Sequence, residues 1–193
     1  MDAKQTAFIA IMSSLGIMLS FITLNLGPIS VAVGSQGAAA LDLSHIATFV
    51  AAVFGGPFVG AAVGFLGGVY AGYYFGYVVG GLGLLSLIGL PLGKALTGLV
   101  SGYIYKKLKI CNGSGHSILA LASTLLSYAP ESVYTILYFL YIVTWVSGSG
   151  MAFMIPLVIP KGWVEVAVMG LMMGVLTSNT SFREFVSGLF RSK

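Results

Sequence analysis

Residues 90–109, LPLGKALTGLVSGYIYKKLK, form an apolar run that ends in a cluster of lysines. Such a run is typical of a helix that crosses a bilayer and stops at its charged surface, because a lysine amine is costly in hydrocarbon. The whole chain has the same character, since 58% of its 193 residues are hydrophobic and 7% are charged. Charges this few cannot cover the surface of a soluble monomer. The sequence therefore predicts an all-α membrane protein with several spanning helices.

Further apolar runs predict a six-transmembrane-helix bundle that forms a single domain over residues 1–193. The expected spans cover residues 5–26, 41–56, 57–74, 90–105, 117–146 and 161–177. We expect the glycine-rich segment Phe75–Gly89 to be an irregular outer connection with at most a short helix. Residues 178–193 are expected to form an amphipathic tail. No connection is long enough to hold a soluble domain.

The positions of the basic residues predict the orientation, because basic residues that flank spans favour the cytoplasm. With six spans and the N-terminus inside, seven of the nine basic residues lie on the cytoplasmic side: Lys4, Lys106, Lys107, Lys109, Arg183, Arg191 and Lys193. Lys94 and Lys161 remain toward the outer side. A seventh span over Phe75–Gly89 would lose this asymmetry. We therefore expect a multi-pass protein of the cell membrane with both termini cytoplasmic.

Ionisable side chains within the spans are the main functional signal, since such groups usually face the bundle interior or a cavity. Those toward the outer half are Asp42, His45, Lys94, Lys161 and Glu165, and Glu131 lies in the fifth span. Their convergence predicts a binding pocket open to the outside. Two alternatives remain: the lysines reach the headgroups, or Glu165 pairs with Lys161 on one face of the same helix.

A stripe of tyrosines in the fifth span is the second signal. Its members share three- and four-residue spacings: Tyr128, Glu131, Tyr134, Thr135, Tyr138 and Tyr141. Phenol rings beside a carboxylate can stack on a flat ligand and bind its polar edge. Ordinary helix packing is the alternative.

Small residues form stripes on two spans. Ala3, Ala7, Ala10 and Ser14 share one face of the first span, where small side chains let another helix approach closely. That helix belongs either to another subunit or to the same bundle. On the third span the glycines at 60, 64, 67, 68 and 72 favour packing within the bundle.

Motifs for common chemistries are absent from the sequence. It has no glycine-rich ATP-binding loop, no zinc-protease motif and no nucleophile elbow. We expect no catalytic residues, no metal and no cofactor, and we expect the chain not to be an enzyme. The net charge of +4 follows from the cytoplasmic flanks and needs no nucleic-acid partner.

Two stretches carry a family resemblance. Residues 41–68, LDLSHIATFVAAVFGGPFVGAAVGFLGG, hold an acidic residue, a short second helix, a Phe-Gly-Gly-Pro turn and a glycine-rich third helix. Residues 92–107 add a fourth helix with a basic end. In this order the chain resembles the substrate-binding S component of an energy-coupling factor (ECF) transporter, of the riboflavin/pantothenate-like type.

The resemblance implies a division of labour in a prokaryotic plasma membrane. An S component binds a vitamin or related micronutrient from outside, while a transmembrane coupling subunit and two ATP-binding subunits drive uptake. By this likeness the substrate site is Gln36, Asp42, Lys94, Thr97, Glu131, Tyr134, Tyr138, Lys161 and Glu165. The docking stripe for the coupling subunit is Ala3, Ala7, Ala10 and Ser14.

The ligand and the function class stay open at this point. Two lysines suit an anionic ligand such as pantothenate, whereas the tyrosines suit a flat one such as riboflavin. A different class is a small integral-membrane enzyme acting on a lipid, with Glu131 or the pair Asp42 and His45 as acid-base groups. A third is an ion-coupled carrier or channel whose buried carboxylates hold a cation or proton.

Overall fold

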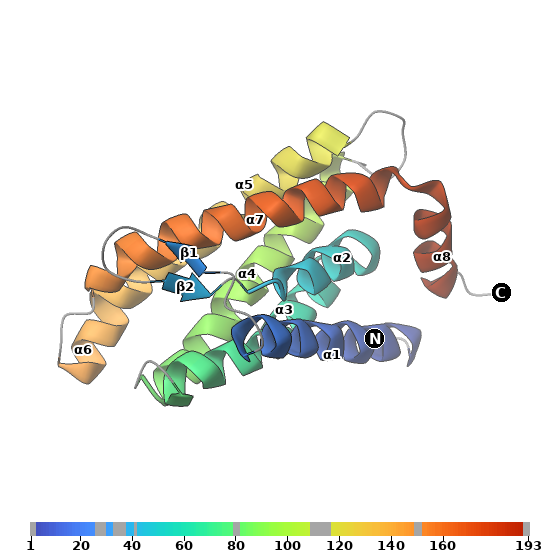
Figure 1. Cartoon of the computed structure of the whole chain (residues 1–193). Helices are drawn as coiled ribbons and strands as arrows, with labels where there is room; N and C mark the ends of the chain where they lie inside the picture. The colour runs from blue at the N-terminus through green and yellow to red at the C-terminus, as the bar shows by residue number, and fades with distance from the viewer. Residues whose placement is uncertain are drawn as a thin grey trace.

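The computed structural model describes residues 3–25, 30–32, 38–40, 42–78, 82–108, 117–148 and 152–190. The described chain is mostly helical (Figure 1). Five helices are long and apolar enough to cross a membrane, over Ala3–Asn25, Pro57–Val78, Leu84–Leu108, Ser117–Val146 and Ala152–Ser178. These helices agree with the predicted all-α membrane fold.

The elements follow the chain in a simple order. They are α1 (Ala3–Asn25), β1 (Ser30–Ala32), β2 (Ala38–Ala40), α2 (His45–Gly55), α3 (Pro57–Tyr73), a π-helical segment (Tyr74–Val78), α4 (Leu84–Leu108), α5 (Ser117–Leu137), a second π-helical segment (Tyr138–Val143), α6 (Thr144–Ser147), a 3-10 turn (Ala152–Met154), α7 (Ile155–Ser178) and α8 (Thr180–Phe190). The two strands pair antiparallel, with Val31 opposite Ala39. Figure 1 shows α5 and α7 running side by side along the bundle.

Glycines bring α3 against its neighbours. A Cβ atom added at Gly60 would lie 2.6 Å from the Ala52 side chain, and one added at Gly72 would lie 2.8 Å from the Ser86 carbonyl oxygen. Nothing larger than hydrogen fits at either position. The prediction that the glycines of this helix serve internal packing is therefore confirmed.

Three boundaries differ from the sequence prediction. The segment Phe75–Gly89 was expected to be irregular, but most of its described part continues α3 as a π-helical segment or begins α4 at Leu84. Helix α7 begins at Ile155 rather than Lys161 and contains Pro160. Pro91 likewise lies inside α4. In an apolar setting a helix is the main way to satisfy backbone groups, so it continues through a proline that would end it in water.

Helix α2 is much shorter than the five helices that are long enough to cross a membrane. Its 11 residues span roughly 16 Å at 1.5 Å per residue, which is about half of a bilayer core. Seven of those residues are buried. The predicted second span is therefore a half-length helix enclosed by the others.

One end of the bundle gathers several chain segments. Phe8 of α1, Val59 of α3 and Val186 of α8 belong to one buried cluster, and the Phe54 and Phe182 rings meet at 5.7 Å. Figure 1 shows α8 at this end, on the right, and α6 at the opposite end. We call it the basic end, because the described basic residues near it are Lys4, Lys106, Lys107 and Arg183. The predicted amphipathic tail is thus a helix, α8, packed on the bundle.

Candidate substrate-binding site

The ionisable residues that the sequence singled out meet inside the bundle. Asp42, His45, Lys94, Glu131 and Glu165 are each at most 7% exposed. Lys94 and Glu165 each lie ten residues beyond the starts of α4 and α7, or roughly 15 Å from those helix ends. The cluster therefore lies near the middle of the spanning helices. We call these five residues and Lys161 the central cluster.

An ion pair fixes the segment before α2 against α4. The Lys94 amine lies 2.5 Å from Asp42 Oδ2 and also donates to the Ser44 hydroxyl. The other Asp42 oxygen accepts hydrogen bonds from the Ser20 hydroxyl at 2.8 Å and the Ser44 backbone N–H at 3.0 Å. Both charges are thus satisfied in the interior, as a buried ion pair requires. Lys94 does not reach for the headgroups.

A second pair joins α2 to α5. His45 Nε2 lies 3.1 Å from Glu131 Oε2, and the Thr97 hydroxyl donates to the same carboxylate. His45 Nδ1 is buried with no hydrogen-bond partner among the described residues. Glu131 is therefore held by an imidazole and a hydroxyl rather than by a lysine. A buried ring nitrogen without a partner is unusual in a folded protein and is able to form a hydrogen bond with a ligand.

The carboxylate of Glu165 connects α7 to the same centre. It accepts a hydrogen bond from the Asp42 backbone N–H at 2.5 Å and lies 3.4 Å from the Lys161 amine. The Lys161 amine also lies 5.3 Å from the centre of the Phe75 ring. Glu165 therefore pairs with Lys161 on the same helix and also faces the interior of the bundle. Both interpretations of Glu165 from the sequence are compatible with the structure.

The tyrosine stripe is divided. Tyr134 and Tyr138 stack with centroids 5.8 Å apart, and a Cβ atom at Gly89 would lie 2.5 Å from the Tyr138 ring. Tyr141 is 66% exposed. The π-helical segment begins at Tyr138 and its i→i+5 pattern turns the following residues off the predicted face. These rings pack on α4, so their role toward a ligand stays a prediction.

The remaining predicted residues lie in different settings. Gln36 lies outside the described residues. The docking stripe is exposed at each of its positions, Ala3, Ala7, Ala10 and Ser14. The buried face of α1 instead carries Ser13, Gly16 and Ser20. The stripe therefore faces away from the bundle, which removes internal packing as its explanation.

Sequence reasoning missed Ser20 and Ser44, which complete the shell around Asp42 and Lys94. A weak signal existed for Ser20, because Ser13 and Ser20 lie seven residues apart on one face of α1, separate from the face that carries the alanines. Ser44 carried no signal apart from its place beside Asp42. Among the described residues, no group of three or more His, Cys, Asp and Glu side chains is placed to hold a metal ion.

Comparison with known proteins returned no matching family model, no similar curated protein and no similar solved structure. The likeness to an S component therefore stays a resemblance in the residues, and function has to be argued from the central cluster and the surfaces around it.

Proposed function

We propose that this chain is a membrane-embedded, high-affinity binding subunit for uptake of a vitamin or related micronutrient, similar to an ECF-transporter S component. A flat, riboflavin-like ligand is favoured, and pantothenate is possible. A separate transmembrane coupling subunit and two ATP-binding subunits power the uptake. The chain crosses a prokaryotic plasma membrane six times, with α2 as the short second crossing and both termini in the cytoplasm.

One observation supports this proposal above all. Polar side chains from five helices and from one non-helical segment contact one another in the central cluster. Asp42, Leu43 and Ser44 are not helical, and Asp42 is bonded to α1, α4 and α7. Irregular backbone at membrane depth is tolerated where it is enclosed by protein or lines a cavity. Many transport proteins likewise have irregular backbone at their substrate sites near the bilayer midplane.

The pairing of the lysines favours the flat ligand over the anionic one. Lys94 is bound to Asp42 and Ser44, and Lys161 lies beside Glu165. A carboxylate ligand would have to compete with protein carboxylates that are already in place. A neutral, flat ligand has no such competitor, and the unpaired His45 nitrogen and the Tyr134 ring are the groups that we expect it to contact.

The basic end supports the orientation. Lys4, Lys106, Lys107 and Arg183 lie toward this end, which the positive-inside tendency assigns to the cytoplasm. The exposed alanine stripe starts at the same end of α1. In this proposal a coupling subunit contacts the stripe, and its ATP-binding partners lie on the cytoplasmic side, where ATP is available.

The contact between His45 and Glu131 favours a second candidate. A histidine 3.1 Å from a carboxylate can transfer protons, so a lipid-modifying enzyme is the alternative. Mass spectrometry of small molecules released from the purified chain separates the two. A vitamin bound one-to-one supports the binding subunit, whereas conversion of lipid by this chain alone supports the enzyme. Vitamin flux into liposomes that hold this chain alone would instead support an ion-coupled carrier.

A further inference from the structure

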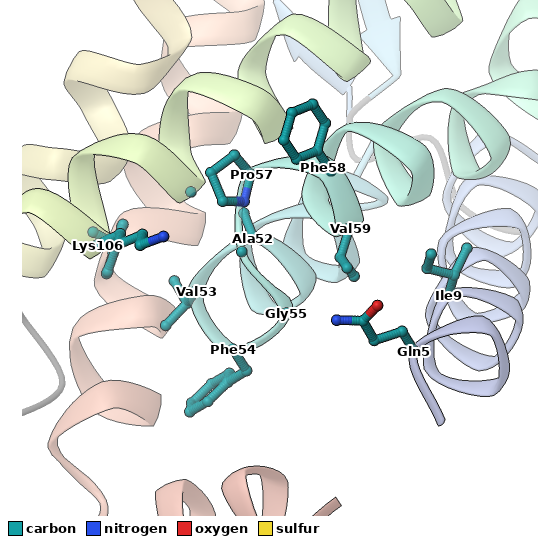
Figure 2. A pocket seen from close by; sticks show the side chains of 13 residues that line it. Gln5, Ile9, Ala52, Val53, Phe54, Gly55, Pro57, Phe58, Val59 and Lys106 are labelled. Carbon is teal, nitrogen blue, oxygen red and sulfur yellow. The ribbon is translucent and has the colours of Figure 1, made fainter. Parts of the chain in front are cut away.

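A separate cavity opens at the basic end of the bundle, about two turns of α4 beyond Lys94 of the central cluster. It holds about 800 Å³ between the start of α1, the turn from α2 to α3 and the end of α4. Small-molecule sites commonly enclose about 300–1,000 Å³. Figure 2 shows Gln5 and Lys106 directed toward this space from opposite sides, with Val53, Pro57 and Val59 between them.

The cavity walls combine apolar side chains with one positive charge. The sides are largely apolar, and the one cation among the lining residues is Lys106. Lys106 is exposed and makes no ion pair with any described residue. At Gly56, with φ +89°, an added Cβ atom would meet nothing within 4 Å. The cavity therefore offers a free amine and an uncovered stretch of backbone above apolar walls.

The location adds a second constraint. The cavity lies where α4 ends in Lys106 and Lys107, and lysines at the end of a spanning helix are typical of the membrane surface rather than of the hydrocarbon. Phe58, another lining residue, is 77% exposed. A hydrophilic anion would gain nothing from these apolar walls, and a hydrocarbon would gain nothing from the amine. An amphiphile with an anionic headgroup uses both.

We propose that this cavity binds one anionic phospholipid from the cytoplasmic leaflet. The phosphate contacts the Lys106 amine, and the acyl chains leave along the exposed Phe58 ring. Basic pockets between spanning helices on the cytoplasmic side recognise anionic headgroups by this charge complementarity. The inference needs the basic end to face a membrane surface, and it does not depend on the proposed transport function.

The test is native mass spectrometry of the full chain released from nanodiscs that contain phosphatidylglycerol and phosphatidylcholine. Retention of one phosphatidylglycerol per chain is expected. Lys106→Gln should reduce that retention at least fivefold, which corresponds to the roughly 1 kcal/mol contributed by one lysine at an anionic surface. Lys107→Gln is the matched control, because it removes the same charge from the adjacent residue, which does not line the cavity. Phe58→Ala should also lower retention while keeping the charge.

Each other outcome overturns the inference. Equal loss in both lysine variants would mean diffuse attraction to the basic end. Equal retention of the two lipids would mean no selection by headgroup. Absence of any retained lipid, with inorganic phosphate protecting the chain against heating as well as the lipid does, would mean a site for free anions. Retention that is unaffected in all three variants would place the lipid elsewhere on the surface.

Discussion

The amine of Lys94 lies 2.5 Å from the Asp42 carboxylate inside the bundle, and each charge has a further polar contact. This pair links the middle of α4 to a segment that is not helical. That segment leads directly into α2, so the pair lies just before the start of this helix. The contribution of the Lys94–Asp42 pair to the stability of the protein can be measured separately from any effect on ligand binding.

We predict that Lys94→Met alone is more damaging than its combination with Asp42→Asn. Removing one partner leaves a buried charge unpaired, which typically costs about 3–5 kcal/mol, whereas replacing both partners is often close to neutral. Thermal unfolding in detergent of the two single variants and the double variant measures the difference. Additive losses would show that the two residues do not act as a pair. Lys107→Met, at the exposed end of α4, is the control for loss of a lysine.

We predict that Glu131→Gln and Lys161→Met each weaken ligand binding by at least about tenfold without unfolding the protein. Loss of a polar partner of a bound ligand typically costs about 1–3 kcal/mol, or roughly 5- to 150-fold in affinity. Isothermal titration with the ligand identified by mass spectrometry measures the effect. Lys107→Met should keep normal affinity. Normal affinity in both cluster variants would remove the central cluster from the binding site.

We predict that a bulky residue in the docking stripe abolishes uptake but not binding. Ala7 and Ala10 are exposed on α1, so Ala7→Trp or Ala10→Leu leaves the interior of the bundle unchanged while blocking close approach of another helix. Uptake is measured with the coupling subunits present, and binding is measured on the chain alone. Val175→Trp is the matched control, because Val175 is 68% exposed on α7. If binding falls together with uptake, the stripe is not a docking surface.

We predict that cysteines at the two ends of the bundle are labelled from opposite sides of the membrane. The background variant is Cys111→Ser. Lys107→Cys should react with an impermeant thiol reagent from the cytoplasm only, and Trp145→Cys, which replaces an 88% exposed residue of α6, from the outside only. Labelling of both positions from one side is incompatible with six crossings.

Much of the fold follows from the sequence, because a membrane limits the options. The apolar runs indicate the spanning helices, and the fifth span was expected over the residues that it occupies, Ser117–Val146. Charged side chains inside a membrane protein also require polar or oppositely charged partners. Asp42, His45, Lys94, Lys161 and Glu165 were expected to converge because ionisable groups within a membrane usually face the bundle interior. Asp42 does contact Lys94 and Glu165, and Glu165 lies beside Lys161.

The pairing within the cluster could not be predicted. Whether Lys94 meets Asp42 or Glu131 depends on helix rotations that hydropathy does not specify. The sequence prediction placed the starts of two spans at residues 90 and 161, whereas α4 begins at Leu84 and α7 at Ile155, so Pro91 and Pro160 lie inside the helices. The π-helical segment at Tyr138 changes the helical period without a sequence signal, so the position of Tyr141 could not be foreseen.

The half length of α2 has a consequence for biogenesis. Its 11 residues are well below the roughly 20 that a translocation channel accepts as a span. Asp42, just before it, is bonded to side chains of residues 20, 94 and 165, and the last of these leaves the ribosome when most of the chain has been made. Under the proposed topology with α2 as the second crossing, we therefore expect α2 to reach its final position only after helices that follow it in the chain have been made.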